Sequence, residues 1–149
     1  KVPLGEDYYT TSVIFSKATK VSVLKNRFYF HRQFPQSQSG TVTPQKASSV
    51  FNVARTLLDY FEAHPLSKRD FRLFREYSAR YQLYGVFIAA VRQNNKDVLD
   101  TFIEEWKRTQ PRISTSDLTA GKRLVVSLAV GGHSDLSLGL YKFLEKIKV

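Results

Sequence analysis

Apolar side chains recur at spacings of three and four residues along the whole chain after Pro44. This spacing places side chains on one face of an α-helix, so it predicts helices rather than strands. The expected helices run from Thr43-Pro44 to about His64, from Ser67 through a long segment that Gly85 bends or interrupts, from Asn95 past Trp106, from Ser116-Asp117 to Gly131, and from Ser134 onward. Short connections between such helices favour antiparallel packing. We therefore expect residues 44–149 to form a helical domain, an antiparallel bundle of four to five helices.

The first 43 residues show a different pattern. Residues 7–17 give a mixed apolar signal that we interpret as a short helix, with the acidic pair Glu6-Asp7 at its N-terminus. Residues 20–24 alternate between polar and apolar, and residues 27–32 are aromatic and strand-like after a Lys25-Asn26 turn. The expected fold class is therefore mainly α, with a short helix and a β-hairpin preceding the helical bundle.

Composition narrows the function classes only in part. The formal charge is +10, which favours an anionic partner such as nucleic acid, acidic lipid head groups or a phosphorylated substrate. The basic residues are spread along the chain rather than gathered in one arm, so nucleic acid is an unlikely partner. The chain has no cysteine and no apolar run near the roughly 20 residues that cross a bilayer. These features fit a cytoplasmic protein, either free in the cytoplasm or peripheral at the inner face of a membrane.

The helix expected after Ser67 carries two groups of side chains with alternative interpretations. The basic residues Lys68, Arg69, Arg72 and Arg80 could contact an anionic membrane, or they could form a solvated face in which arginines pair with Asp70 and Glu76. The aromatic residues of this helix either belong to the core or line a groove on which sugars stack; they are Phe71, Phe74, Tyr77, Tyr81 and Tyr84.

The order of motifs in the first part of the chain resembles a known enzyme family. Glu6-Asp7 opens a helix, the small-residue step 17–21 follows, and the aromatic segment Tyr29-Phe30-His31-Arg32 leads into Ser39-Gly40-Thr41. This order and spacing resemble the C-terminal part of family 2 glycosyltransferases of the GT-A type. The resemblance covers about residues 3–43. It implies that residues 1–43 are the end of a nucleotide-sugar-binding α/β catalytic domain whose remainder lies upstream of Lys1.

The resemblance also implies a role for each matching residue. Asp7 would be the general base that takes the proton from an acceptor hydroxyl, and Glu6 would orient the acceptor or contact it. His31 and Arg32 would face the donor diphosphate and offset the charge of the leaving group. The complete enzyme would use Mg²⁺ or Mn²⁺, but this chain has no Asp-x-Asp motif, so the isolated fragment is expected to hold no metal and to be inactive.

The implied reaction is an inverting transfer of a sugar from a nucleotide-diphosphate donor to a hydroxyl of a saccharide or lipid-linked acceptor. Its expected setting is surface polysaccharide biosynthesis. The competing interpretation treats Glu6-Asp7 as an ordinary helix cap and His31-Arg32 as an exposed strand end. The chain would then be a stand-alone basic helical module that binds nucleic acid or a protein partner without chemistry.

Overall fold

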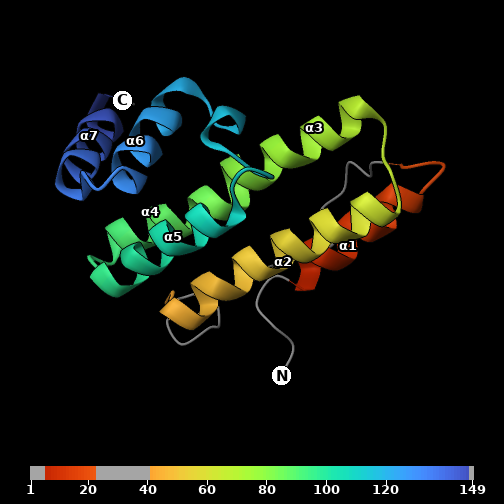
Figure 1. Cartoon of the computed structure of the whole chain (residues 1–149), viewed down its shortest axis with the longest axis horizontal. Coiled ribbons are helices and arrows are strands. Elements are labelled where there is room, and N and C mark those ends of the chain that lie inside the picture. The colour runs from red at the N-terminus through yellow and green to blue at the C-terminus, as the bar shows by residue number, and fades with distance from the viewer. Residues whose placement is uncertain (1–5, 23–40, 148–149) are drawn as a thin grey trace.

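The structure, a computed structural model, describes residues 6–22 and 41–147 (Figure 1). The α-helices of these ranges are α1 (Glu6–Lys17), α2 (Pro44–Ala63), α3 (Lys68–Tyr77), α4 (Tyr84–Arg92), α5 (Lys96–Thr109), α6 (Ala120–Val130) and α7 (Ser134–Ile147). A π-helical segment, η1 (Ser78–Leu83), joins α3 to α4, and a short 3₁₀ turn, η2 (Thr115–Asp117), precedes α6.

Side-chain caps begin the helices where the sequence predicts them. The Thr43 hydroxyl accepts a hydrogen bond from the backbone N–H of Lys46 at 3.3 Å, and Pro44 stands in the first turn of α2. Ser67 and Asn95 cap α3 and α5 through the same kind of bond. Each cap satisfies a first-turn N–H that has no partner inside the helix. The predicted starts of α2, α3 and α5 are thus confirmed.

The prediction of a β-hairpin is wrong. No residue in the described ranges forms a strand, and residues 20–22, where the hairpin would begin, have no regular secondary structure. The remaining hairpin residues, 23–32, lie outside the described residues. Alternation over residues 20–24 is a short local signal, whereas a strand also needs a neighbouring strand to pair its backbone groups. The predicted helical bundle is compatible with the structure.

Two helix boundaries also differ from expectation. The long second helix is interrupted at η1 rather than at Gly85, which lies inside α4. The fourth predicted helix begins at Ala120 instead of Ser116, because Ser114 and Asp117 form a capping box that closes η2 first. In Figure 1, α3, η1 and α4 nevertheless follow one another as a single rod beside α2.

An aromatic cluster fills the centre of the bundle, where α2, α4 and α5 meet. The ring of Phe51 packs edge-on against Phe102 and Trp106, with centroids 5.7 and 6.4 Å apart, and Phe87 lies 5.5 Å from Phe102. All four side chains are fully buried. α6 and α7 form a hairpin at one end of the bundle, and α1 packs on the other side of α2 (Figure 1). This arrangement leaves α1 at the edge of the helical unit.

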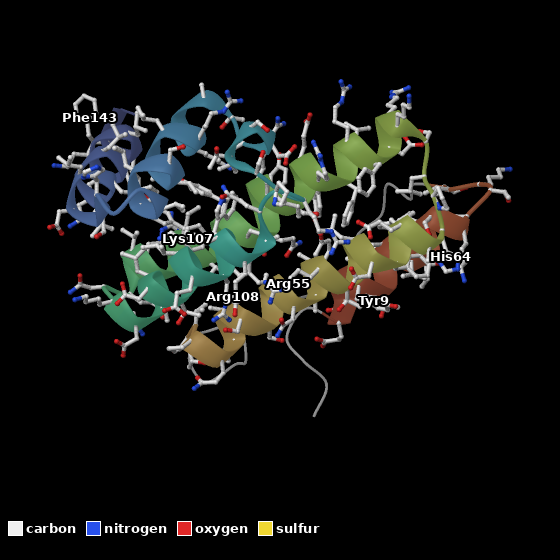
Figure 2. All side chains as sticks on the ribbon, in the orientation of Figure 1. Tyr9, Arg55, His64, Lys107, Arg108 and Phe143 are labelled. Atoms are coloured by element: carbon white, nitrogen blue, oxygen red, sulfur yellow. The ribbon has the colours of Figure 1, made fainter. Side chains whose placement is uncertain are left out.

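An ion-paired network joins α2 to α5. The Glu105 carboxylate is buried and forms ion pairs with Arg55 at 2.8 Å and with Arg108 at 3.5 Å. Figure 2 shows Arg55 on α2 and Arg108 on α5 on the face where these helices lie side by side. Arg55 also donates to the Thr109 hydroxyl at 3.1 Å. Part of the positive charge seen in the sequence is therefore neutralised inside the fold.

Helix length and polarity bear on the membrane question. Among the helices of residues 6–22 and 41–147, none is both long enough and apolar enough to traverse a lipid bilayer.

Candidate functional site

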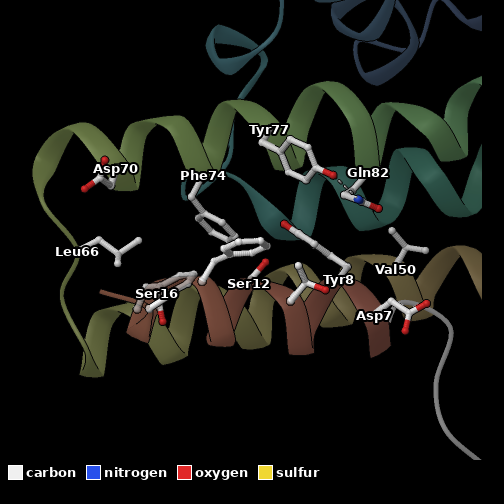
Figure 3. Close-up of a pocket in the computed structure, with 14 residues that line it drawn as sticks. Asp7, Tyr8, Ser12, Ser16, Val50, Leu66, Asp70, Phe74, Tyr77 and Gln82 are labelled. Atoms are coloured by element: carbon white, nitrogen blue, oxygen red, sulfur yellow. Dashed lines mark hydrogen bonds between the residues drawn. The ribbon is translucent and has the colours of Figure 1, made fainter. Parts of the chain in front are cut away.

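A large cavity lies between α1, α2 and the α3–η1 rod. Its volume is about 950 Å³, near the upper end of the range for small-molecule sites. α1 contributes Asp7, Tyr8 and Ser12 to its wall, and the rod contributes Phe74, Tyr77 and Gln82 (Figure 3). The cavity is thus built jointly by α1 and by the helices that follow Thr43.

Tyr8 anchors α1 to the helical domain. It is the buried residue of α1, and its hydroxyl is hydrogen-bonded to the Ser78 hydroxyl at the start of η1. Ser78 donates its own proton to the Phe74 carbonyl at 2.7 Å, so the Tyr8 hydroxyl is the donor in the bond between the two side chains. Burial raises the pKa of Tyr8 well above its usual range, so Tyr8 stays neutral and keeps this proton.

The π-helical segment brings two further polar groups to the cavity. A π-helix is wider than an α-helix, so residues five apart, rather than four, lie above one another. Gln82 and Tyr77 are related in this way, and the Gln82 amide lies 3.4 Å from the Tyr77 hydroxyl (Figure 3). Both side chains line the cavity. Regular α-helical geometry would have rotated one of them away.

Asp7 stands at one end of this cavity. Its side chain is exposed and lines the wall next to Tyr8, while Leu66 and Asp70 line the opposite end (Figure 3). A carboxylate in the first turn of a helix lies near unpaired backbone N–H groups, whose partial positive charge attracts it. An ionised carboxylate that borders a concave surface can accept a proton from a hydroxyl bound there.

The two adjacent acids of α1 face different surfaces. Consecutive residues of an α-helix are rotated by about 100°. Glu6 accordingly points away from the Asp7 cavity and lines a smaller hollow of about 290 Å³ with Tyr9, Thr10 and Val53. The structure therefore does not bring Glu6 and Asp7 together around one ligand.

The other predicted site residues are distributed as follows. His31 and Arg32 lie outside the described residues. Lys68, Arg69 and Arg72 are exposed on α3. Arg80 is engaged within the fold, since it pairs with Glu76 at 3.1 Å and donates to the Asp117 carbonyl at 3.0 Å. The exposed basic face of α3 is therefore smaller than the sequence suggests.

Sequence reasoning missed the contributions of Ser12 and Gln82. Ser12 lies four residues after Tyr8 and therefore on the same helix face, so its position could have been predicted from the spacing. Gln82 has no comparable signal, because its position depends on the π-helical turn. As for metals, no group of three His, Asp or Glu side chains within the described part of the chain is close enough to hold an ion.

Comparison with known proteins adds no relative. No protein-family model, no curated protein and no solved structure matches this chain. The site must therefore be interpreted from its own residues and from the motif order in the sequence.

Proposed function

We propose that the chain is the C-terminal part of an inverting family 2 glycosyltransferase, in which Asp7 is the general base. The observation that carries the proposal is the position of Asp7, exposed at the end of a cavity of about 950 Å³ that α1 shares with the helical domain. The motif order in residues 3–43 supplies the reaction class, and the cavity supplies a place for the acceptor.

The chemistry of inverting transfer needs such a carboxylate. A sugar hydroxyl is a weak nucleophile, and it attacks the anomeric carbon of the donor more readily when its proton is removed during attack. The new bond to the acceptor oxygen forms as the bond to the nucleotide diphosphate breaks, and the carboxylate of Asp7 receives the hydroxyl proton. A single displacement of this kind inverts the anomeric centre.

The neighbours of Asp7 suit an acceptor with several hydroxyl groups. Ser12 and Gln82 can donate or accept hydrogen bonds, and the Tyr77 ring lines the same wall. The hydrogen bond from the Tyr8 hydroxyl to Ser78 holds α1, the helix that carries Asp7, against η1. Because an error of 1 Å in positioning can cost about a hundredfold in rate, this anchoring matters for the base.

The donor and metal sites of the proposed enzyme would come from outside the described residues. His31 and Arg32 would contact the donor diphosphate. In the complete enzyme, Mg²⁺ or Mn²⁺ would be held by residues of the catalytic domain upstream of this chain. The exposed Lys68, Arg69 and Arg72 would rest on an anionic membrane at its cytoplasmic face, close to a lipid-linked acceptor.

The decisive experiment replaces Asp7 by Asn in the complete enzyme. This change keeps the shape of the side chain and removes its basicity, so kcat should fall by roughly 10²- to 10⁴-fold while nucleotide-sugar binding is unchanged. Asp70→Asn, at the opposite end of the same cavity, is the matched control and should retain most of the activity. Activity of Asp7→Asn close to that of the parent would refute the assignment.

A further inference from the structure

Two tyrosine rings lie exposed beside each other next to the cavity. Tyr77 and Tyr81 are 49% and 65% exposed, and their ring centroids are 5.2 Å apart with 34° between the planes. Large aromatic side chains are usually buried, because each removes 150–250 Å² from water when it is covered. A pair of exposed rings at the edge of a cavity is therefore a feature that needs an explanation.

Neighbouring groups hold the two rings in place. Tyr77 contacts the Tyr8 ring, with centroids 6.2 Å apart, and its hydroxyl interacts with Gln82. On the other side, the Lys122 ammonium lies 5.4 Å from the centre of the Tyr81 ring and donates to the Arg80 carbonyl at 3.0 Å. A surface that is ordered before binding loses less conformational entropy when a ligand arrives.

Tyr77 connects the exposed pair with the Asp7 site. It lines the cavity and also packs against Tyr81, which stands outside the cavity wall. A ligand whose reactive hydroxyl lies at Asp7 can thus extend past Tyr77 onto Tyr81. The π-helical segment makes this continuous surface possible, because it sets Tyr77, Tyr81 and Gln82 on neighbouring turns of one rod.

Charge decides which class of ligand fits this surface. The charged residues that line the described cavity are Asp7 and Asp70, both acidic, so an anionic ligand would be repelled at either end. The Lys122 ammonium beside Tyr81 is directed at the Arg80 carbonyl and at the rings of Tyr81 and Tyr84. The remaining wall combines aromatic rings with hydroxyl and amide groups. The apolar C–H face of a sugar ring stacks on an aromatic face, and its hydroxyl groups bond to such polar neighbours. The surface therefore suits an uncharged saccharide.

We propose that Tyr77 and Tyr81 form a stacking subsite for the sugar units that precede the acceptor sugar. This inference rests on the proposed function and adds the class of acceptor: an uncharged glycan chain of at least two sugars. The sugar that receives the new linkage lies at Asp7, and the preceding sugar stacks on Tyr77 and then Tyr81.

Binding by the 149-residue chain tests this subsite without requiring catalysis. The probes are uncharged oligomers of hexose and of N-acetylhexosamine, two to six units long, applied as an array, and the best binder is then titrated by calorimetry. The double variant Tyr77→Ala/Tyr81→Ala should bind that oligomer about tenfold more weakly or worse, whereas Tyr77→Phe/Tyr81→Phe should keep most of the affinity. Circular dichroism confirms that each variant is folded.

Phe143→Ala is the matched control, because Phe143 is 59% exposed on α7, well away from the cavity (Figure 2). It should bind like the parent chain. The inference is overturned if no oligomer binds, if the double alanine variant binds as well as the parent, or if Phe143→Ala loses as much affinity.

Kinetics of the complete enzyme separate this inference from the proposed function. Tyr81→Ala removes a ring outside the cavity wall and should raise KM for a long acceptor several-fold, while KM for a monosaccharide acceptor and kcat stay close to those of the parent. If Asp7→Asn abolishes transfer while KM for the long acceptor stays unchanged in the tyrosine variant, the stacking subsite is wrong and the transferase stands. If Asp7→Asn remains active, the transferase proposal itself fails.

Discussion

Removal of the Tyr8 side chain should release α1 from the rest of the molecule. Tyr8 is the buried residue of α1, and its contacts with Phe74, Tyr77 and Ser78 connect this helix to the α3–η1 rod. An isolated helix of 12 residues has marginal stability in water, so α1 depends on this packing for its helical state. Tyr8→Ala therefore tests whether one side chain holds the Asp7 segment in position.

The expected magnitude follows from the burial of Tyr8. A buried aromatic side chain removes about 150–250 Å² from water, which at about 25 cal/mol per Å² gives an upper bound of about 4–6 kcal/mol. Truncations of buried aromatic residues to alanine typically cost 3–5 kcal/mol. Because Tyr8 is slightly exposed and α1 is at the edge of the fold, we expect about 3 kcal/mol, lost mainly from α1 docking.

Hydrogen exchange is the appropriate assay, because it reports the opening of α1 separately from global unfolding. In Tyr8→Ala, the amides of residues 10–17 should exchange about a hundredfold faster, while those of α2 and α5 keep their protection. Tyr8→Phe removes only the hydrogen bond to Ser78 and should cost about 1 kcal/mol. Ile14→Ala is the control within the same helix, since Ile14 is 60% exposed, and should change little.

Two results would refute this reasoning. If the amides of α1 remain as protected in Tyr8→Ala as in the parent chain, Tyr8 is not the anchor. If α2 and α5 lose as much protection as α1, then α1 is an integral part of the bundle and not a separately docked helix.

Three further predictions concern stability and membrane contact. Glu105→Gln removes the charge that pairs with Arg55 at 2.8 Å and should lower the free energy of unfolding by about 2 kcal/mol in urea titrations; no change would mean that the pair is energetically neutral. Burial raises the pKa of Tyr84 to about 12, so the folded chain keeps a proton that the unfolded chain loses near pH 10. The Tyr84 contribution to stability should therefore be complete below pH 10 and fall by about 1 kcal/mol between pH 10 and 11, in addition to the contribution of buried Tyr8. Tyr84→Phe should make the fall less steep, and an equally steep fall in that variant would contradict the assignment. Charge reversal in Arg69→Glu/Arg72→Glu should weaken binding to anionic vesicles, at about 1 kcal/mol per basic residue lost, with neutral vesicles as the control; unchanged sedimentation would reject a lipid-facing α3.

Local chemistry in the sequence determined most of the helix starts. Thr43, Ser67 and Asn95 precede apolar segments of helical period, and all three act as N-caps. The short helix after Glu6-Asp7 was also predicted, and α1 confirms it. These features depend on neighbours within one or two turns, so the sequence contains the information that specifies them.

The wrong predictions share one cause, which is their dependence on distant partners. Residues 20–24 alternate like a strand, but strand pairing needs a second strand, and the described residues provide none. The π-helical turn at Ser78–Leu83 likewise has no local signature, and it sets the positions of Tyr77 and Gln82.

Only the tertiary structure distinguished the two acids of α1. Glu6 and Asp7 are adjacent in the sequence, and in a helix their side chains point in directions about 100° apart. The sequence does not show which of the two faces a cavity. The bond between Tyr8 and Ser78, two residues 70 positions apart in the chain, settles the rotation of α1 on the bundle. With Tyr8 turned inward, Asp7 faces the cavity and Glu6 faces a separate hollow. Which face of a helix is buried depends on the surface it meets, and that surface forms only when the chain folds.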